Sequence, residues 1–265
     1  MNLGRVRSFI LQNGLFYGLG ALLVFGLKYH YSRAGSEDLH WILAPTARLV
    51  ELFGGIRFEQ EAGAGFISHA HHMIIGPSCA GINFLTIVFS ALFFSFAYRM
   101  EGQRRKFLWL AFTMAAAYLL TLGVNALRIG AAIFLYGADI YGGWITPTRV
   151  HRIEGTLIYF FFLTLFYLAG DRAVSRLASF STPTARGAFT FLPPFFWYML
   201  IALIIPALHL APIQNGGVFA EHSILVIASC IALMILLFTG RLVYHKVAGR
   251  LGLRRRNKAT VRESR

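Results

Sequence analysis

The chain has 265 residues, of which 57% are hydrophobic and 14% charged, and its formal net charge is +14. Several apolar runs reach about twenty residues, the length that a helix needs to cross the hydrocarbon core, which excludes an ordinary soluble globular protein. The basic residues stand in short loops and a C-terminal tail beside these runs, without interleaved aromatic platforms, so we expect membrane lipid rather than nucleic acid as a partner. The composition predicts an all-α polytopic membrane helical bundle that forms one domain over residues 1–265.

The first apolar run is predicted to be a membrane span. It extends from about Phe9 to Leu27 and follows Arg5 and Arg7. The run is long for the apolar region of a signal peptide, and no small-residue cleavage site follows it. We therefore expect an uncleaved span with its N-terminus in the cytoplasm.

Residues 28–79 are predicted to lie on the outer side. Within them, residues 39–53 are apolar but are interrupted by Pro45 and by charged residues, and the stretch is too short to span. This pattern predicts one interfacial or re-entrant helix on the outer face. Residues 54–73 are polar and contain several glycines, which predicts a short hairpin.

Five more apolar runs bring the expected number of transmembrane helices to about six. They cover about residues 80–98, 107–136, 153–169, 191–210 and 223–238, and a basic tail of residues 240–265 follows. With this topology the inner segments, including the loop that carries Arg186, hold most of the Lys and Arg residues, whereas the outer segments are close to neutral. That asymmetry satisfies the positive-inside rule and predicts that both termini are cytoplasmic.

The stretch Gly76-Pro-Ser-Cys79-Ala-Gly-Ile-Asn83 opens the second span. It predicts that Cys79 lies in the first turn of that helix, where unpaired N–H groups and the helix dipole favour the thiolate. Cys230 lies deep in the last span, so we expect no disulfide and a free Cys79 thiol. The alternative is that Cys79 only packs.

Arg128 is the only charged residue within the third span. An arginine there costs at least about 2.5 to 3.5 kcal/mol on insertion, so it is expected to have a partner, a water-filled surrounding or a task. It follows Phe107 by about 31 Å of helix rise, which places it near the outer boundary, at the level of Cys79. Asn125 precedes it by three residues on the same helix face and is expected to support it. The alternative is an arginine that extends to lipid head groups.

His151 opens the fourth span from the outer side. The outer ends of three spans thus carry a thiol, a guanidinium and an imidazole, a set suited to acyl transfer. The imidazole can move the thiol proton, and the cation can stabilise the oxyanion. Glu154, one turn later, is placed to orient the ring or to form an ordinary helix pair. Arg149 and Arg152 are interpreted as rim charges that meet phospholipid.

A competing site consists of His69, His71 and His72. Imidazole and thiolate are the usual ligands of zinc, but in a strand the first two side chains share a face and His72 points away. We expect a solvated outer strand, and neither a metal nor a cofactor. A metal-dependent membrane hydrolase that uses His69, His71 and His151 is the alternative.

Three motifs resemble the exosortase/archaeosortase family of integral-membrane cysteine transpeptidases, and within it the small exosortase K type. They are Gly76-Pro-Ser-Cys79-Ala-Gly81-Ile-Asn83-Phe, Asn125-Ala-Leu-Arg128-Ile and His151-Arg-Ile-Glu-Gly155, in the family's order. The resemblance covers about residues 40–170 and implies that Cys79 is the nucleophile, Arg128 the anion stabiliser and His151 the acid/base. Asn83, Asn125 and Glu154 are expected to support them. The chain departs from the family in having about six spans rather than eight, and Cys-Ala-Gly where Cys-Ser-Gly is usual.

The resemblance implies a cysteine peptidase or transpeptidase in a bacterial inner membrane. Such an enzyme cleaves, through a thioester, the C-terminal sorting signal of membrane-tethered exported proteins, which consists of a short motif, a transmembrane helix and a basic tail. The alternative is a non-enzymatic transporter or assembly factor in which Arg128 binds an anionic substrate. A transporter is expected to carry further polar groups near mid-membrane, whereas the last two spans offer only Pro206, His209 and Cys230.

Overall fold

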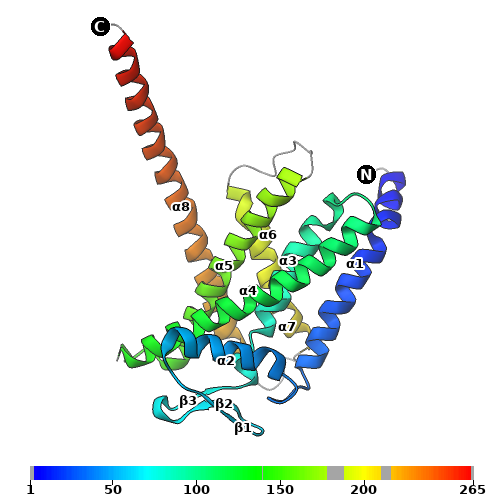
Figure 1. The fold of residues 1–265 in the computed structure, drawn as a ribbon, viewed down its shortest axis with the longest axis vertical. Helices are drawn as coiled ribbons and strands as arrows, with labels where there is room; N and C mark the ends of the chain where they lie inside the picture. The colour runs from blue at the N-terminus through cyan, green and yellow to red at the C-terminus, as the bar shows by residue number, and fades with distance from the viewer. Residues whose placement is uncertain (1–2, 139, 178–187, 210–215, 264–265) are drawn as a thin grey trace.

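The computed structural model describes residues 3–138, 140–177, 188–209 and 216–263. It is a bundle of helices with one small sheet at the end away from both termini (Figure 1). The predicted all-α polytopic membrane bundle is thereby confirmed. Arg186 and the predicted span end at residue 210 lie outside the described residues.

Five helices are long and apolar enough to cross a membrane. They are α1 (Leu3–Tyr31), α3 (Ile82–Phe96), α4 (Gln103–Gly137), α5 (Pro147–Leu177) and α8 (Gly216–Glu263). The candidate span around α3 begins at Pro77, and that of α8 covers Gly217–Tyr244. These helices account for five of the six predicted spans, and the molecule is a membrane protein by their length and composition.

The remaining predicted span is present but is not a uniform α-helix. It consists of α6 (Leu192–Met199), a π-helical stretch η5 (Leu200–Ile204) and α7 (Ile205–His209). Pro206 has no N–H for the carbonyl of Ala202 four residues earlier, so the α-helical hydrogen-bond ladder is interrupted here. The wider π turn lies at this interruption.

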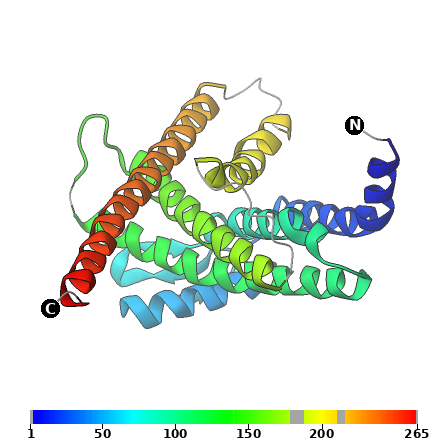
Figure 2. The same cartoon turned by 90° about the horizontal axis from the view of Figure 1, so that it is seen from above.

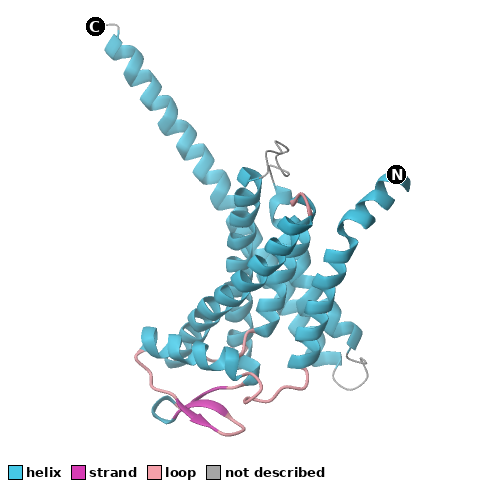
Figure 3. Ribbon diagram, turned by 45° about the vertical axis from the view of Figure 1, so that its right-hand side comes forward, coloured by secondary structure: helices cyan, strands magenta, loops and turns pink. Residues whose placement is uncertain are grey.

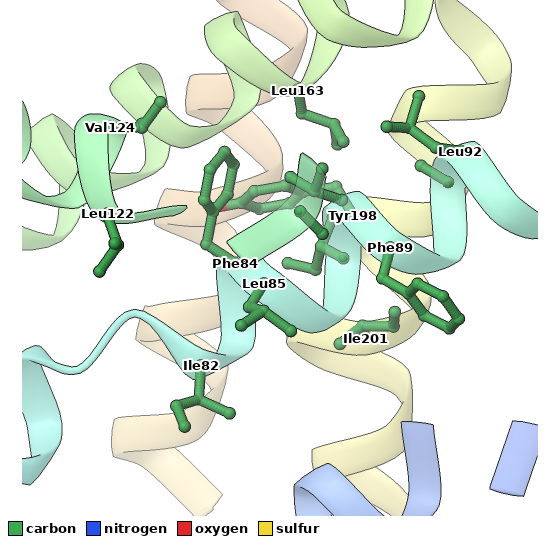
Figure 4. Packing of buried hydrophobic residues seen from close by; sticks show 14 of the residues in the cluster. Ile82, Phe84, Leu85, Phe89, Leu92, Leu122, Val124, Leu163, Tyr198 and Ile201 are labelled. Atoms are coloured by element: carbon green, nitrogen blue, oxygen red, sulfur yellow. The ribbon is translucent and has the colours of Figure 1, made fainter. Parts of the chain in front are cut away.

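Helix α3 forms the centre of the bundle and packs against α1, α4, α5 and α6. In its most apolar window 72% of the residues are buried, whereas the other four candidate spans have 17 to 39%. Figure 4 shows Phe84, Leu85 and Phe89 of α3 among side chains of the neighbouring helices, including Leu163 and Tyr198. The other spans therefore have large surfaces left for lipid, while α3 is surrounded by protein.

The outer helices lie on opposite sides of this centre. Seen from above, α8 crosses α5, which it contacts, and α1 lies beside α3 on the other side (Figure 2). The N-terminus, the turn between α3 and α4 and the C-terminal part of α8 are at one end of the molecule, and α2 and the strands are at the other (Figure 3). Because both terminal segments lie at the same end, this arrangement agrees with an even number of membrane crossings.

Helix α2 (His40–Gly54) corresponds to the predicted interfacial or re-entrant segment, and it packs on α4 and on the sheet. One face is buried and the other is exposed, with Leu52 and Phe53 at 75% and 79% exposure. Pro45 lacks the N–H that would bind the carbonyl of Trp41, and the Tyr118 hydroxyl of α4 donates to that carbonyl instead at 2.8 Å. The Trp41 and Tyr118 rings also stack, with centroids 5.7 Å apart, so the proline of α2 coincides with its attachment to α4.

The polar segment after α2 forms an antiparallel sheet in the order β1-β2-β3. Its strands are β1 (Glu59–Glu61), β2 (Gly65–Ser68) and β3 (Met73–Ile75). The predicted hairpin is thus present as β1 and β2, and β3 extends it. The three histidines do not lie on a strand as expected: a 3-10 turn, η1 (His69–His71), connects β2 to β3, and His72 follows with φ 49°.

The close approach of α1 to α3 depends on Gly20. A Cβ at this position would lie 2.5 Å from an atom of the Phe93 ring, whereas at Gly18, on the exposed side of the same helix, a Cβ would meet nothing within 4 Å. Small residues allow such close contact between membrane helices.

We therefore expect Gly20→Ala to destabilise the protein by about 1 to 3 kcal/mol through overpacking. Gly18→Ala is the matched control and should leave stability unchanged or slightly raised, because alanine favours a helix. Thermal unfolding in detergent measures both. Equal melting temperatures for the two variants would contradict the close α1–α3 packing.

Candidate active site

Cys79 lies in a short irregular turn at the sheet end of the bundle. This 3-10 turn, η2 (Pro77–Cys79), follows β3 directly, and α3 begins only at Ile82. The thiol is partly exposed and free, and its Sγ is 3.9 Å from the Ser78 hydroxyl. Cys79 is therefore before the helix and not in its first turn as predicted. Because the helix dipole acts mainly within the first turn, less of its effect reaches the sulfur.

Gly81 links the turn to the helix. It has φ 72° and ψ 11°, a left-handed conformation that glycine adopts without steric cost. A Cβ at this position would be 3.1 Å from Asn125 Cγ and 3.1 Å from Thr121 Cγ2, both on α4. The missing side chain thus permits both the change of direction and the contact with α4.

Asn125 fixes the carbonyl of Cys79. It is fully buried in α4, and its Nδ2 donates a hydrogen bond of 2.6 Å to the Cys79 carbonyl oxygen. Its Oδ1 accepts a bond of 2.7 Å from the hydroxyl of Tyr159 on α5. The Tyr159 ring in turn stacks on Phe84 of α3, with centroids 4.4 Å apart. This network connects the turn that carries Cys79 to three helices, and buried networks whose members are satisfied are rigid.

Arg128 lies beside this network. Its side chain is 9% exposed, and its guanidinium carbon is 5.4 Å from the centre of the Tyr159 ring. Gly155 of α5 lies beside it, at a distance where a Cβ would make ordinary contact with Arg128 Nη1. Among the residues that the structure describes, Arg128 Nε has no hydrogen-bond partner. A buried donor of this kind is available to a bound group.

His151 and Glu154 come from the start of α5. The His151 side chain is 49% exposed, that of Glu154 only 7%, and Nδ1 of the imidazole is 3.9 Å from a Glu154 carboxylate oxygen. This is the ion pair expected from their spacing, at a distance too long for a hydrogen bond. Both residues interact electrostatically with Arg128. Within the described part of the chain, no hydrogen bond joins His151 to the Cys79 sulfur.

Asn83 and Arg149 have partners that the sequence did not predict. Lys28 Nζ of α1 donates a bond of 2.6 Å to Asn83 Oδ1, so this asparagine holds the end of α1. Arg149 Nε is 2.7 Å from a carboxylate oxygen of Glu221 on α8. The expectation that Arg149 meets phospholipid is replaced by an ion pair between α5 and α8.

Two imidazoles of the histidine cluster contact neighbouring protein side chains. His69 Nε2 is 3.0 Å from a Glu61 oxygen, and His71 Nδ1 is 3.3 Å from the Ser68 hydroxyl. No group of three or more potential metal-ligating side chains gathers anywhere in the described ranges. The geometry therefore lends no support to a site made of His69, His71 and His151.

Two tyrosines belong to this region although the sequence analysis did not single them out. Tyr159 binds Asn125, and the Tyr31 hydroxyl of α1 lies 3.3 Å from the Pro77 carbonyl oxygen. The available signal was weak: Tyr159 follows His151 by eight residues, about two turns, and thus shares its helix face. Nothing in the sequence placed the end of α1 against Pro77.

No family model, no curated protein and no solved structure matches the chain. The groups themselves indicate which chemistry is possible. A free thiol can act as a nucleophile, a buried guanidinium with an unused donor can stabilise an anion, and an imidazole near a carboxylate can carry a proton. This combination is suited to acyl transfer.

The contact between Gly81 and Asn125 can be tested with Gly81→Ala. An alanine at this position must adopt the left-handed conformation, which costs about 1 to 2 kcal/mol. Its methyl group also presses against Asn125. Gly55→Ala is the matched control, because Gly55 has φ 66° and ψ 13° with nothing within 4 Å of a Cβ.

We expect both variants to be destabilised, and only Gly81→Ala to change the rate at which a small thiol reagent alkylates Cys79. Thermal unfolding and quantitative mass spectrometry of the Cys79 peptide measure the two effects. An unchanged alkylation rate in Gly81→Ala would show that Asn125 does not set the position of the thiol.

Proposed function

We propose that the protein is a membrane-embedded cysteine peptidase or transpeptidase with Cys79 as its nucleophile. The observation that carries this proposal is the hydrogen-bonded path from the Cys79 carbonyl through Asn125 to Tyr159, whose ring Arg128 contacts. This path brings residues of η2, α4 and α5 into one region. A cysteine that only packs would not need a buried arginine with an unused donor nearby.

In the proposed mechanism the Cys79 thiolate attacks the carbonyl carbon of the scissile peptide bond. The C–S bond forms as the carbonyl electrons move to oxygen, and the Arg128 guanidinium stabilises that negative charge. The tetrahedral intermediate collapses as the C–N bond breaks, and His151 gives a proton to the departing amine. The resulting thioester is resolved by an acceptor amine or by water.

His151 is exposed enough to turn during the reaction. Nδ1 of its ring is 3.9 Å from a Glu154 carboxylate oxygen, near enough for Glu154 to orient the imidazole. Catalytic hydrogen bonds are commonly long before substrate binds, so the missing contact between His151 and the sulfur is compatible with this role. Glu154 acts here as a positioning residue.

The proposal includes an orientation in a bacterial inner membrane. The region around Cys79 lies at the sheet end, and the two termini lie at the other end with the basic C-terminal segment (Figure 1). The positive-inside rule then assigns the termini to the cytoplasm and Cys79 to the periplasmic surface. A substrate with a short motif, a transmembrane helix and a basic tail would present its motif at this same surface.

The nucleophile is tested by Cys79→Ala, with Cys230→Ala as the matched control. Cys230 is fully buried in α8, apart from the proposed machinery. We expect Cys79→Ala to fold normally and to abolish release of C-terminal helices from exported membrane-tethered proteins, whereas Cys230→Ala retains it. Proteomic measurement of uncleaved C-terminal peptides in cells that carry each variant provides the readout.

Arg128→Lys belongs to the same experiment. It is expected to lower processing by about 10²-fold, because a point charge lacks the planar arrangement of donors. Continued processing in Cys79→Ala would disprove the proposed function. If processing continued in Cys79→Ala but was lost in Arg128→Lys, the anion-binding transporter or assembly factor would be the better explanation.

A further inference from the structure

Tyr31 is the last residue of α1, and its hydroxyl lies beside the turn that carries Cys79. It donates to the Pro77 carbonyl oxygen at 3.3 Å, two residues before the nucleophile. It also interacts electrostatically with both Cys79 and Arg128. The first helix therefore brings a fourth polar group to a region otherwise built from η2, α4 and α5.

The hydrogen bond from Tyr31 to Pro77 is easily given up. Its length is beyond the usual range for a hydroxyl donor, which ends near 3.0 Å. The Pro77 carbonyl also accepts a bond of 3.1 Å from the backbone N–H of Ala80. Redirecting the Tyr31 proton would thus leave the carbonyl with a partner.

The position of Tyr31 is held by the residue one turn earlier in α1. Lys28 and Tyr31 are three residues apart and share a helix face. Lys28 Nζ binds Asn83 Oδ1 in the first turn of α3 at 2.6 Å. The end of α1 is thereby fixed to the start of the helix that follows Cys79, and a hydroxyl held in this way needs little reorganisation to act on a bound group.

Two side-chain donors near Cys79 are committed to the buried network. Asn125 Nδ2 is bound to the Cys79 carbonyl, and the Tyr159 hydroxyl is bound to Asn125 Oδ1. Among the described residues Arg128 Nε has no hydrogen-bond partner, and the Tyr31 hydroxyl is only weakly bound. Tyr31 interacts electrostatically with Arg128 as well as with Cys79, so both donors belong to the same region.

We propose that Tyr31 is a further catalytic residue, whose hydroxyl donates a hydrogen bond to the carbonyl oxygen of the acyl group as Cys79 attacks it. This inference rests on the proposed function. In the step concerned, sulfur forms a bond to the carbonyl carbon and the carbonyl π electrons move to oxygen. Tyr31 and Arg128 stabilise that oxyanion, and the Tyr31 proton stays on its oxygen throughout.

The inference is tested with Tyr31→Phe in the purified full chain, using two reagents that modify Cys79 by different chemistry. Acylation by para-nitrophenyl acetate passes through a tetrahedral oxyanion, whereas alkylation by iodoacetamide displaces iodide and forms none. We expect Tyr31→Phe to lower the acylation rate by about 10²-fold, the effect of losing one oxyanion donor, and to leave the alkylation rate unchanged. Mass spectrometry of the Cys79 peptide measures both rates.

Tyr29→Phe is the matched control, because Tyr29 is on the same helix and 49% exposed. It should change neither rate. Equal losses of acylation and alkylation in Tyr31→Phe would overturn the inference by showing that Tyr31 only positions or activates the thiol, and unchanged acylation would overturn it directly. If the unsubstituted protein alkylates at Cys79 but accepts no acyl group there, the proposed function itself fails.

Discussion

The hydrogen bond from Asn125 to the carbonyl of Cys79 is the contact on which the rest of the site depends. Between β3 and α3 the chain passes through an irregular turn, and the groups of such a turn cannot be left without partners where the chain enters the bundle. Asn125 supplies the donor from inside α4, and Gly81 leaves the space for it. The amide thus serves a structural need and at the same time sets where the sulfur lies.

The burial of α3 strengthens this arrangement. Because α3 is surrounded by α1, α4, α5 and α6, several neighbouring helices can contribute side chains near its start. Tyr31, Asn125 and Tyr159 come from three of these helices and all contact η2 or each other. A turn at the end of a peripheral helix would be open to lipid on one side and would lack some of these partners.

Much of the fold was predictable from the sequence because span length and charge placement are strong signals. The five long helices, the amphipathic α2 and the polar hairpin all follow from apolar run length and from where charges interrupt it. The π-helical turn was not predictable, since a run containing one proline in apolar surroundings fits several helix geometries. Nor was the third strand, because three-residue strands carry little periodicity.

The candidate site was predictable only along the helix axis. Rise per residue placed Cys79, Arg128 and His151 at the ends of their segments, but rotation about the axis depends on side-chain packing. For this reason Tyr159 was missed although it is two turns from His151, and Asn83 was expected at the site although it binds Lys28. Cys79 was expected inside the helix because the left-handed Gly81, which delays the helix start, cannot be distinguished by sequence from an ordinary small residue.

The π-helical stretch Leu200–Ile204 has a consequence for how this protein can vary. Each residue of an α-helix advances the side chains by about 100°, so one additional residue in a turn rotates everything beyond it by that angle. The side chains of α7 are therefore rotated about the helix axis relative to those with which α6 packs against α3. Deleting one residue from this stretch would restore α geometry and rotate α7, whereas a compensating insertion nearby would return it to register. In related sequences, insertions and deletions in this helix should therefore occur as compensating pairs. A single insertion or deletion should occur only where the contacts of α7 have also changed.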